Sequence, residues 1–142
     1  MAFKQHKIKL IGRREWVNFP SLNINDVEAK IDTGAYTSSI HCEKIIESNN
    51  QLVVIFDGNV KHSFSQFTKK KIKNSFGEME ERYIIKTLIT IGRKKINTTI
   101  SLSDRGNMRY PVLIGRRLLK GKFIIDVNLI YTNGLNLKTL LK

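Results

Sequence analysis

An aspartate at the end of a short strand is the residue of this chain best placed for carboxylate chemistry. Residues 27–31 alternate apolar and charged side chains, which predicts a half-buried strand, and Asp32 follows directly. Thr33 can form a local hydrogen bond, and Gly34 permits a sharp turn. A carboxylate held on a rigid turn is well placed to act as an acid or a base, although Asp-Thr-Gly also suits an ordinary capped turn.

The elements that position this aspartate are expected to be short strands joined by turns, in an all-β sandwich or barrel with one short helix. The Asp57-Gly58 pair is the strongest hairpin signal, and residues 52–56 form an apolar run expected to be buried on both faces. Residues 133–134 suggest a terminal hairpin, and residues 69–73 form a basic strand or loop. The predicted strands are 7–11, 15–19, 22–31, 37–47, 52–56, 60–67, 82–91, 96–103, 111–115 and 123–126, with one helical turn at 116–120.

A second stretch, residues 110–119, is an apolar strand that ends in Gly115 and continues as Arg-Arg-Leu-Leu. Together with the earlier Asp-Thr-Gly-Ala, it resembles the paired signatures of retroviral-type aspartic proteases. In that family the apolar segment ending in glycine packs beside the Asp-Thr-Gly turn. The resemblance therefore implies that Asp32, Thr33 and Gly34 form a catalytic motif.

The wider sequence resembles a bacterial family of retropepsin-like aspartic proteases, from about residue 8 to about residue 127. The resemblance implies a pepsin-type closed β-barrel, with one domain over residues 1–142 and a core over about 8–127. The family is associated with the ligase that adds glutamates to a ribosomal protein, and some members are labelled ATP-dependent zinc proteases. The matching segments lie at 11–17, 29–35, 37–41, 75–80, 104–105 and 113–116.

Aspartic protease chemistry requires two carboxylates that share one proton, one acting as a base and the other as an acid. The chain has one Asp-Thr-Gly sequence, and Asp57, Asp104 and Asp126 lie in no such motif. We therefore expect a two-fold homodimer in which Asp32 of each subunit meets its counterpart. The tail at 128–142 is a candidate for part of the dimer interface.

The resemblance also implies a flap that covers the substrate. It corresponds to residues 75–82, where Gly77 would allow bending and Glu80 and Arg82 would lie near the substrate.

Tyr36 stands where the viral relatives usually carry an acid that pairs with the arginine corresponding to Arg116. A tyrosine cannot form that ion pair. Arg116 is therefore expected either to pair with another acid, Glu80 or Asp104, or to face the substrate together with Ala35 and Tyr36. An unpaired arginine in a cleft would be a good bidentate site for a carboxylate.

Neither a metal nor another cofactor is expected from the residue types. The candidate zinc ligands are His6, His41, His62 and Cys42, and they lack the spacing of a zinc motif. The neighbours His41 and Cys42 would point to opposite faces of a strand, with His41 either partly buried or close to Asp32. The chain contains no Walker-type phosphate loop that would support a role for ATP.

The charge of the chain favours anionic partners, because 25 basic and 12 acidic residues give a net charge of +13. The leading hypothesis is a peptidase acting on an acidic peptide, such as a glutamate tail added by the associated ligase. The alternative is a non-catalytic module of the same fold that binds a ribosomal protein, RNA or the ligase through its basic surface.

The sequence also carries expectations about location. It has one cysteine, which excludes an internal disulfide and fits a reducing compartment. It shows no apolar signal segment, and no apolar run approaches the roughly 20 residues that span a bilayer. We expect a cytoplasmic protein that makes no membrane contact.

Overall fold

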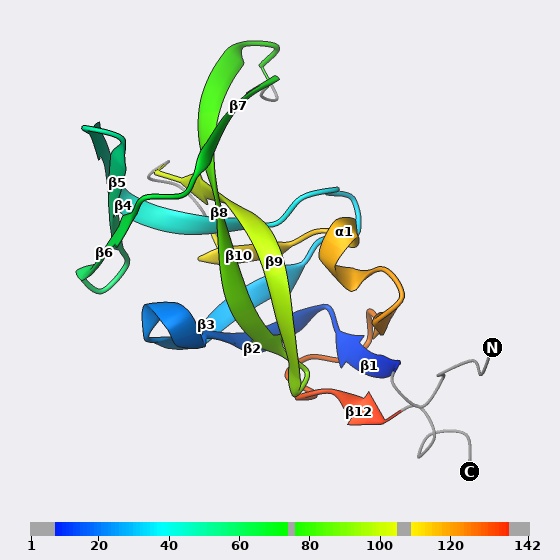
Figure 1. The fold of residues 1–142 in the computed structure, drawn as a ribbon. Helices are drawn as coiled ribbons and strands as arrows, with labels where there is room; N and C mark the ends of the chain where they lie inside the picture. Colours follow the sequence, from blue (N-terminus) through cyan, green and yellow to red (C-terminus); the bar gives the residue numbers. More distant parts are fainter. Residues whose placement is uncertain (1–7, 74–75, 105–108, 137–142) are drawn as a thin grey trace, which may run out of the picture.

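The computed structural model describes residues 8–73, 76–104 and 109–136, and most of these lie in β-strands (Figure 1). Among them are one short helix, α1 (Arg116–Leu119), and a 3-10 turn (Pro20–Leu22), so the predicted all-β class with one short helix is confirmed. No described helix is long and apolar enough to cross a membrane. The strands are β1 (Lys9–Gly12), β2 (Arg14–Phe19), β3 (Ile24–Ile31), β4 (Ser39–Ser48), β5 (Gln51–Phe56), β6 (Val60–Phe64), β7 (Thr68–Lys73), β8 (Met79–Ile91), β9 (Lys94–Ser103), β10 (Val112–Ile114), β11 (Phe123–Asp126) and β12 (Leu135–Asn136).

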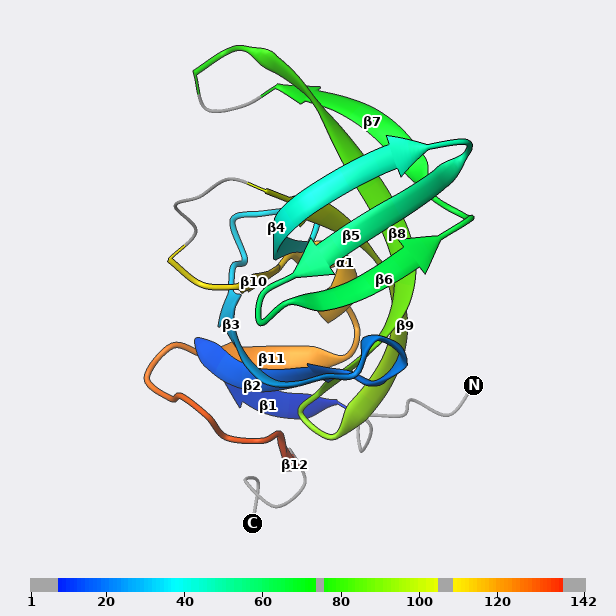
Figure 2. The ribbon, with the colours of Figure 1, turned by 90° about the vertical axis from the view of Figure 1, so that its left-hand side faces the viewer.

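Strand pairing in the larger sheet forms a ring. The order is β10-β3-β2-β8-β9-β4, and β10 also pairs with β4. β10 runs parallel to β3 and antiparallel to β4. Beyond β4, the antiparallel strands β5 and β6 extend the sheet, as Figure 2 shows. The parallel pairing of β3 with β10 brings the two sequence landmarks together.

The core is filled by side chains that alternate along the strands. On β8, Ile85 and Ile89 are buried while Lys86 is exposed, as expected for a strand with one face toward the core. Residues 52–56 alternate as well, with every second residue from Leu52 onward buried and the others only half-buried. The prediction that this run is buried on both faces is therefore wrong, because β5 lies in the extension beyond the ring.

A second, three-stranded sheet joins segments from the two ends of the described chain. β1 lies between β11, which is parallel to it, and β12, which is antiparallel. The predicted hairpin at 133–134 is therefore wrong, because this turn leads into a strand that pairs with β1. Gly134 is required there: its φ is +77°, and a Cβ atom would lie 2.3 Å from the carbonyl oxygen of Gly92. Residues 137–142 of the proposed interface tail lie outside the described residues.

One buried carboxylate ties this second sheet to the ring. Glu15 on β2 is 1% exposed. Its Oε2 accepts hydrogen bonds from the backbone N–H groups of Gly12 (2.7 Å) and Thr132 (3.1 Å) and from the Thr132 hydroxyl (2.7 Å). Its Oε1 accepts from the N–H of Asn133 at 3.0 Å. Glu15 thus fixes the segment before β12 against the turn between β1 and β2.

Candidate active site

Asp32 begins the turn that ends β3. Its backbone N–H donates to the carbonyl oxygen of Ile114 (2.8 Å), and the N–H of Ala35 donates to the carbonyl oxygen of Asp32 (3.1 Å). The side-chain Oδ1 accepts from the N–H of Gly34 at 3.1 Å, while Oδ2 makes no hydrogen bond with another described residue. The turn therefore holds a half-buried carboxylate with one oxygen engaged and the other available.

The second landmark packs beside this turn and holds it in place. The N–H groups of Arg116 and Arg117 donate to the carbonyl oxygens of Ala35 (2.8 Å) and Tyr36 (3.0 Å). The N–H of Gly115 donates to Oγ of Ser38 at 3.0 Å. The loop that follows Asp32 is thus fixed by three hydrogen bonds from a segment about 80 residues further along the chain.

Replacing Gly115 by alanine tests this bracing. A Cβ atom would lie 2.5 Å from the carbonyl oxygen of Thr37 and 2.8 Å from the carbonyl carbon of Tyr36, and backbone atoms cannot rotate away. We expect Gly115→Ala to lower the free energy of unfolding by about 1–3 kcal/mol, and to displace the loop that follows Asp32. The measurements are chemical denaturation and peptide cleavage.

Gly58→Ala is the control for a glycine substitution. At Gly58 φ is +79° and no atom lies within 4 Å of the added Cβ, so this variant reports backbone strain without a clash. It should lose about 1 kcal/mol of stability and keep its cleavage activity. Equal effects of the two substitutions on activity would contradict the bracing role of Gly115.

The prediction that Arg116 pairs with Glu80 or Asp104 is wrong among the described residues. Its Nη1 donates to the carbonyl oxygen of Thr33 at 3.0 Å, and its guanidinium carbon lies 5.8 Å from the centroid of the Tyr36 ring. A carbonyl dipole and an aromatic face replace the expected acid. The other expectation, that Arg116 and Ala35 face the substrate, stays a prediction.

The predicted flap lies at the turn between β7 and β8, and this hairpin projects from the rest of the molecule (Figure 1). Gly77 in the turn has a φ of +81°. On β8, Glu80 Oε1 accepts a hydrogen bond from Nε of Arg82 at 2.8 Å and forms an ion pair with Nη2 of the same side chain, also at 2.8 Å. Arg82 lines a cavity together with residues 37–38, so one face of the hairpin is directed toward the loop after the Asp32 turn. Residues 74–75 lie outside the described part of the chain.

Asp32 itself lines a different cavity, of about 260 Å³. Its described walls also include Lys30, Arg109, Tyr110 and Leu113, so Asp32 is the one carboxylate among them. The sequence reasoning missed Lys30 and Arg109. Lys30 could have been found, because residues two apart on a strand share a face and Lys30 precedes Asp32 by two. No sequence pattern indicated Arg109, because it lies outside a strand, in the segment before β10, where alternation does not show which way a side chain points.

The side chains that were considered as zinc ligands contact different groups and do not gather at one place. His41 Nδ1 lies 2.7 Å from Oδ1 of Asp57, and His62 Nε2 lies 2.7 Å from the carbonyl oxygen of Leu22. Cys42 is buried, and burial raises the pKa of its thiol to about 12. Within the described ranges, no group of three His, Cys, Asp or Glu side chains is arranged to hold a metal ion. His6 lies outside those ranges.

Comparison with curated proteins finds related segments in larger enzymes. A probable alpha-L-glutamate ligase from Desulfotalea psychrophila is 33% identical over 129 residues, which cover 83% of this chain and 28% of that protein. A probable alpha-L-glutamate ligase from Shewanella halifaxensis is 29% identical over 134 residues, covering 82% of this chain and 28% of that protein. The chain thus spans 28% of the length of these relatives.

Comparison with solved structures supports the fold. A Legionella pneumophila protein of unknown function has a crystal structure that matches this chain with a TM-score of 0.70 and 25% identity. The match covers 87% of this chain and 97% of that one.

A family model described as retropepsin-like aspartic endopeptidase RimB matches residues 10–134, which include both the Asp32 turn and the Gly115 segment. The chain therefore belongs to the RimB-like family of retropepsin-like aspartic endopeptidases.

Proposed function

We propose that the protein is a homodimeric aspartic endopeptidase in which the Asp32 carboxylates of two subunits share one proton. The observation that carries this proposal is the environment of the Asp32 carboxylate. Its Oδ1 is held by the N–H of Gly34, its Oδ2 makes no hydrogen bond with a described residue, and no other carboxylate is among the described residues lining its cavity. The chemistry needs a second acid, and two-fold pairing of identical turns would supply it.

The two carboxyl groups would then take different roles. Two like charges in contact cannot both persist, so one carboxyl keeps a proton while the other is ionised. The ionised group removes a proton from a water molecule, whose oxygen attacks the carbonyl carbon of the scissile bond. The protonated group donates to the carbonyl oxygen, and the resulting diol collapses as the C–N bond breaks and its nitrogen takes up a proton.

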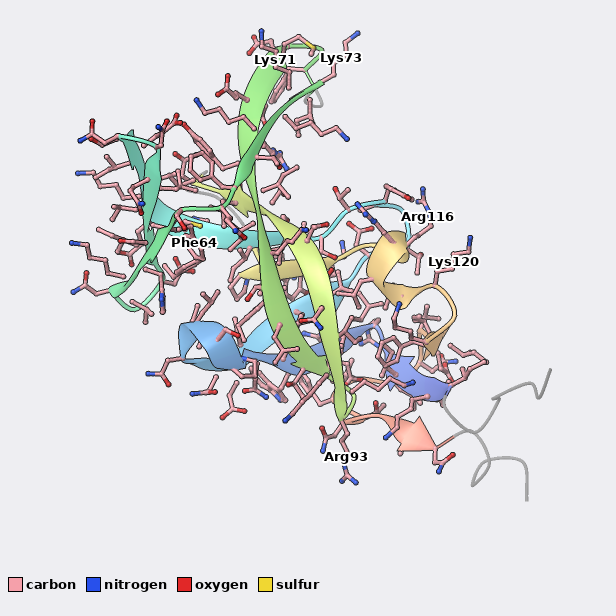
Figure 3. All side chains as sticks on the ribbon, in the orientation of Figure 1. Phe64, Lys71, Lys73, Arg93, Arg116 and Lys120 are labelled. Carbon is pink, nitrogen blue, oxygen red and sulfur yellow. The ribbon has the colours of Figure 1, made fainter. Side chains whose placement is uncertain are left out.

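An acidic peptide, in particular a glutamylated one, is the proposed substrate. A cavity of about 490 Å³ beside the Asp32 turn is lined by several cations and by no carboxylate of a described residue. Figure 3 shows Arg116 and Lys120 projecting on the same side of the molecule from α1 and the residue after it. The names of the curated relatives, probable alpha-L-glutamate ligases, support a glutamyl peptide or such a ligase as a partner. The polar and charged residues that line this cavity are Thr33, Tyr36, Arg116, Arg117 and Lys120.

Peptide cleavage measured over a range of protein concentrations tests this function. We expect the specific activity to rise with concentration and reach a plateau, because one subunit carries only one of the two carboxylates. Sedimentation of the same samples should show the dimer forming over the same range. A glutamate-rich peptide should be cut faster than a neutral peptide of equal length.

Two outcomes would contradict parts of the proposal. Activity that stays constant while the protein is monomeric would exclude the shared dyad. Cleavage of the neutral peptide while the glutamate-rich peptide stays intact would exclude the acidic substrate.

The alternative function, a binding module without catalysis, is favoured by one feature of the surface. Lys71 and Lys73 extend from the tip of the β7–β8 hairpin (Figure 3). Lys69, by contrast, is paired with Glu47 at 2.5 Å. An absence of cleavage at every protein concentration, together with RNA binding that weakens steeply with salt, would support this module instead.

A further inference from the structure

A cavity of about 220 Å³ lies between the β7–β8 hairpin and the loop that follows the Asp32 turn. It is lined by cations and hydroxyl groups, and no carboxylate of a described residue is among its lining residues. The cations come from separate elements, with Lys70 on β7, Arg82 on β8 and Arg117 on α1. The remaining walls are formed by Thr37, Ser38, Thr68, Ile72, Ile84, Thr99 and Ser101.

Two of the three cations are available to a ligand. Arg82 is engaged by Glu80, as described above, so this pair adds little net charge. The side chains of Lys70 and Arg117 make no hydrogen bond or ion pair with any described residue. Two uncompensated cations in one cavity with partly apolar walls attract an anion. A carboxylate fits this site, because a guanidinium can bind both of its oxygens and an acidic side chain of a peptide supplies it.

Arg117 is better placed than Arg116 to bind an acidic side chain. Arg116 already uses its guanidinium on the carbonyl oxygen of Thr33 and the ring of Tyr36. Arg117 is attached to the loop through its backbone, whose N–H donates to the carbonyl oxygen of Tyr36, and its side chain is uncommitted. It also lines the cavity that contains Thr33 and Tyr36, so it connects the Asp32 turn with the hairpin.

We propose that this cavity is a subsite for a side-chain carboxylate of the peptide, with Arg117 and Lys70 as specificity-determining residues. The inference rests on the proposed peptidase function and adds the place where an acidic side chain is bound. The hydroxyl groups of Thr37, Thr68 and Thr99 make no hydrogen bond with other described residues and supply further donors.

The test compares two fluorogenic peptides, blocked at both ends, that differ only in carrying glutamate or glutamine. We expect Arg117→Gln to lower the ratio of kcat/KM for glutamate over glutamine about tenfold, because charge-assisted hydrogen bonds are lost. Lys70→Gln should lower the ratio less, and Arg117→Lys should retain part of it. The value of kcat/KM should fall less for the glutamine peptide than for the glutamate peptide, since the backbone contact of Arg117 is kept and only the glutamate peptide loses a charge-assisted contact.

Arg93→Gln is the matched control for the loss of one positive charge. Arg93 lies at the turn between β8 and β9, at the end of the molecule away from the β7–β8 hairpin (Figure 3). Its substitution should leave the glutamate-to-glutamine ratio unchanged. An unchanged ratio in both Arg117→Gln and the double variant with Lys70→Gln would overturn the subsite, as would an equal loss on both peptides.

A binding measurement distinguishes failure of this inference from failure of the proposed peptidase function. If the wild-type protein cuts neither peptide, the peptidase proposal fails, and calorimetric titration with the blocked glutamate peptide decides the subsite. About tenfold weaker binding by Arg117→Gln than by wild type would support it. No binding by wild type, or equal binding by both proteins, would overturn it.

Discussion

Replacing Asp32 by asparagine is expected to lower kcat for peptide cleavage by about 10²- to 10⁴-fold while leaving the dimer intact. An amide cannot take a proton from water, so the dyad loses both its base and its shared proton. Asparagine keeps an Oδ1 that can accept from the N–H of Gly34, so the turn should hold its shape. The measurements are cleavage kinetics and sedimentation on the same preparation.

Asp26→Asn is the matched control. Asp26 is an exposed carboxylate on the same strand, β3, with a φ of 53°, a conformation that asparagine accepts readily. This variant should cleave as the wild type does. Unchanged cleavage by Asp32→Asn would move the chemistry away from the turn, whereas loss of the dimer in that variant would make the turn a structural part of the interface.

Replacing Glu15 by alanine is expected to lower the free energy of unfolding by about 3–5 kcal/mol, because a buried acceptor of four hydrogen bonds is removed. The unpaired donors would be the N–H groups of Gly12, Thr132 and Asn133, whereas the Thr132 hydroxyl could still donate to the carbonyl oxygen of Leu10. Some of this loss is recovered if water enters the space. Chemical denaturation at one fixed protein concentration is the measurement, since a dimer's apparent stability depends on concentration.

Two further variants make the Glu15 experiment specific. Glu15→Gln keeps the size of the side chain but turns a donor group toward other donors, so it should lose part of the same stability. Glu43 on β4 is exposed, and Glu43→Ala should change stability by less than about 0.5 kcal/mol. A loss of less than about 1 kcal/mol in Glu15→Ala would show that the four hydrogen bonds contribute little net stability.

The positions of the strands could be predicted because each depends on neighbouring residues. The alternation of side chains at 27–31 and 96–103 predicts strands, and the structure has β3 and β9 there. The buried face of β9 was not predicted as well, because Ser101 and Ser103 are buried along with Ile100 and Leu102. The ends of the strands could not be predicted as well as their positions. β8 begins at Met79 rather than at 82 because it pairs with β7, where Lys73 lies opposite Met79. Whether 69–73 was strand or loop was likewise decided by this pairing.

Side-chain partners between distant elements could not be predicted. Glu15 looks like any polar residue of an alternating strand, and its burial depends on Thr132 and Asn133, more than 115 residues away. Arg116 was expected to need an acid, but the structure satisfies it with the Thr33 carbonyl oxygen. Arg117 was overlooked because nothing in its neighbours shows that it meets the hairpin.

The sequence by itself determined that Asp-Thr-Gly forms a turn at the end of a strand and that an apolar strand ends at Gly115, because these depend on neighbouring residues. The resemblance to aspartic proteases added two expectations, that the segments pack together and that a second carboxylate is required. Only the tertiary structure decided how the two landmarks are joined and which cations gather near them. The parallel pairing of β3 with β10 and the hydrogen bonds of α1 to residues 35–36 connect parts of the chain about 80 residues apart. Contacts of that separation arise when the ring of strands forms, and no local pattern of residues encodes them.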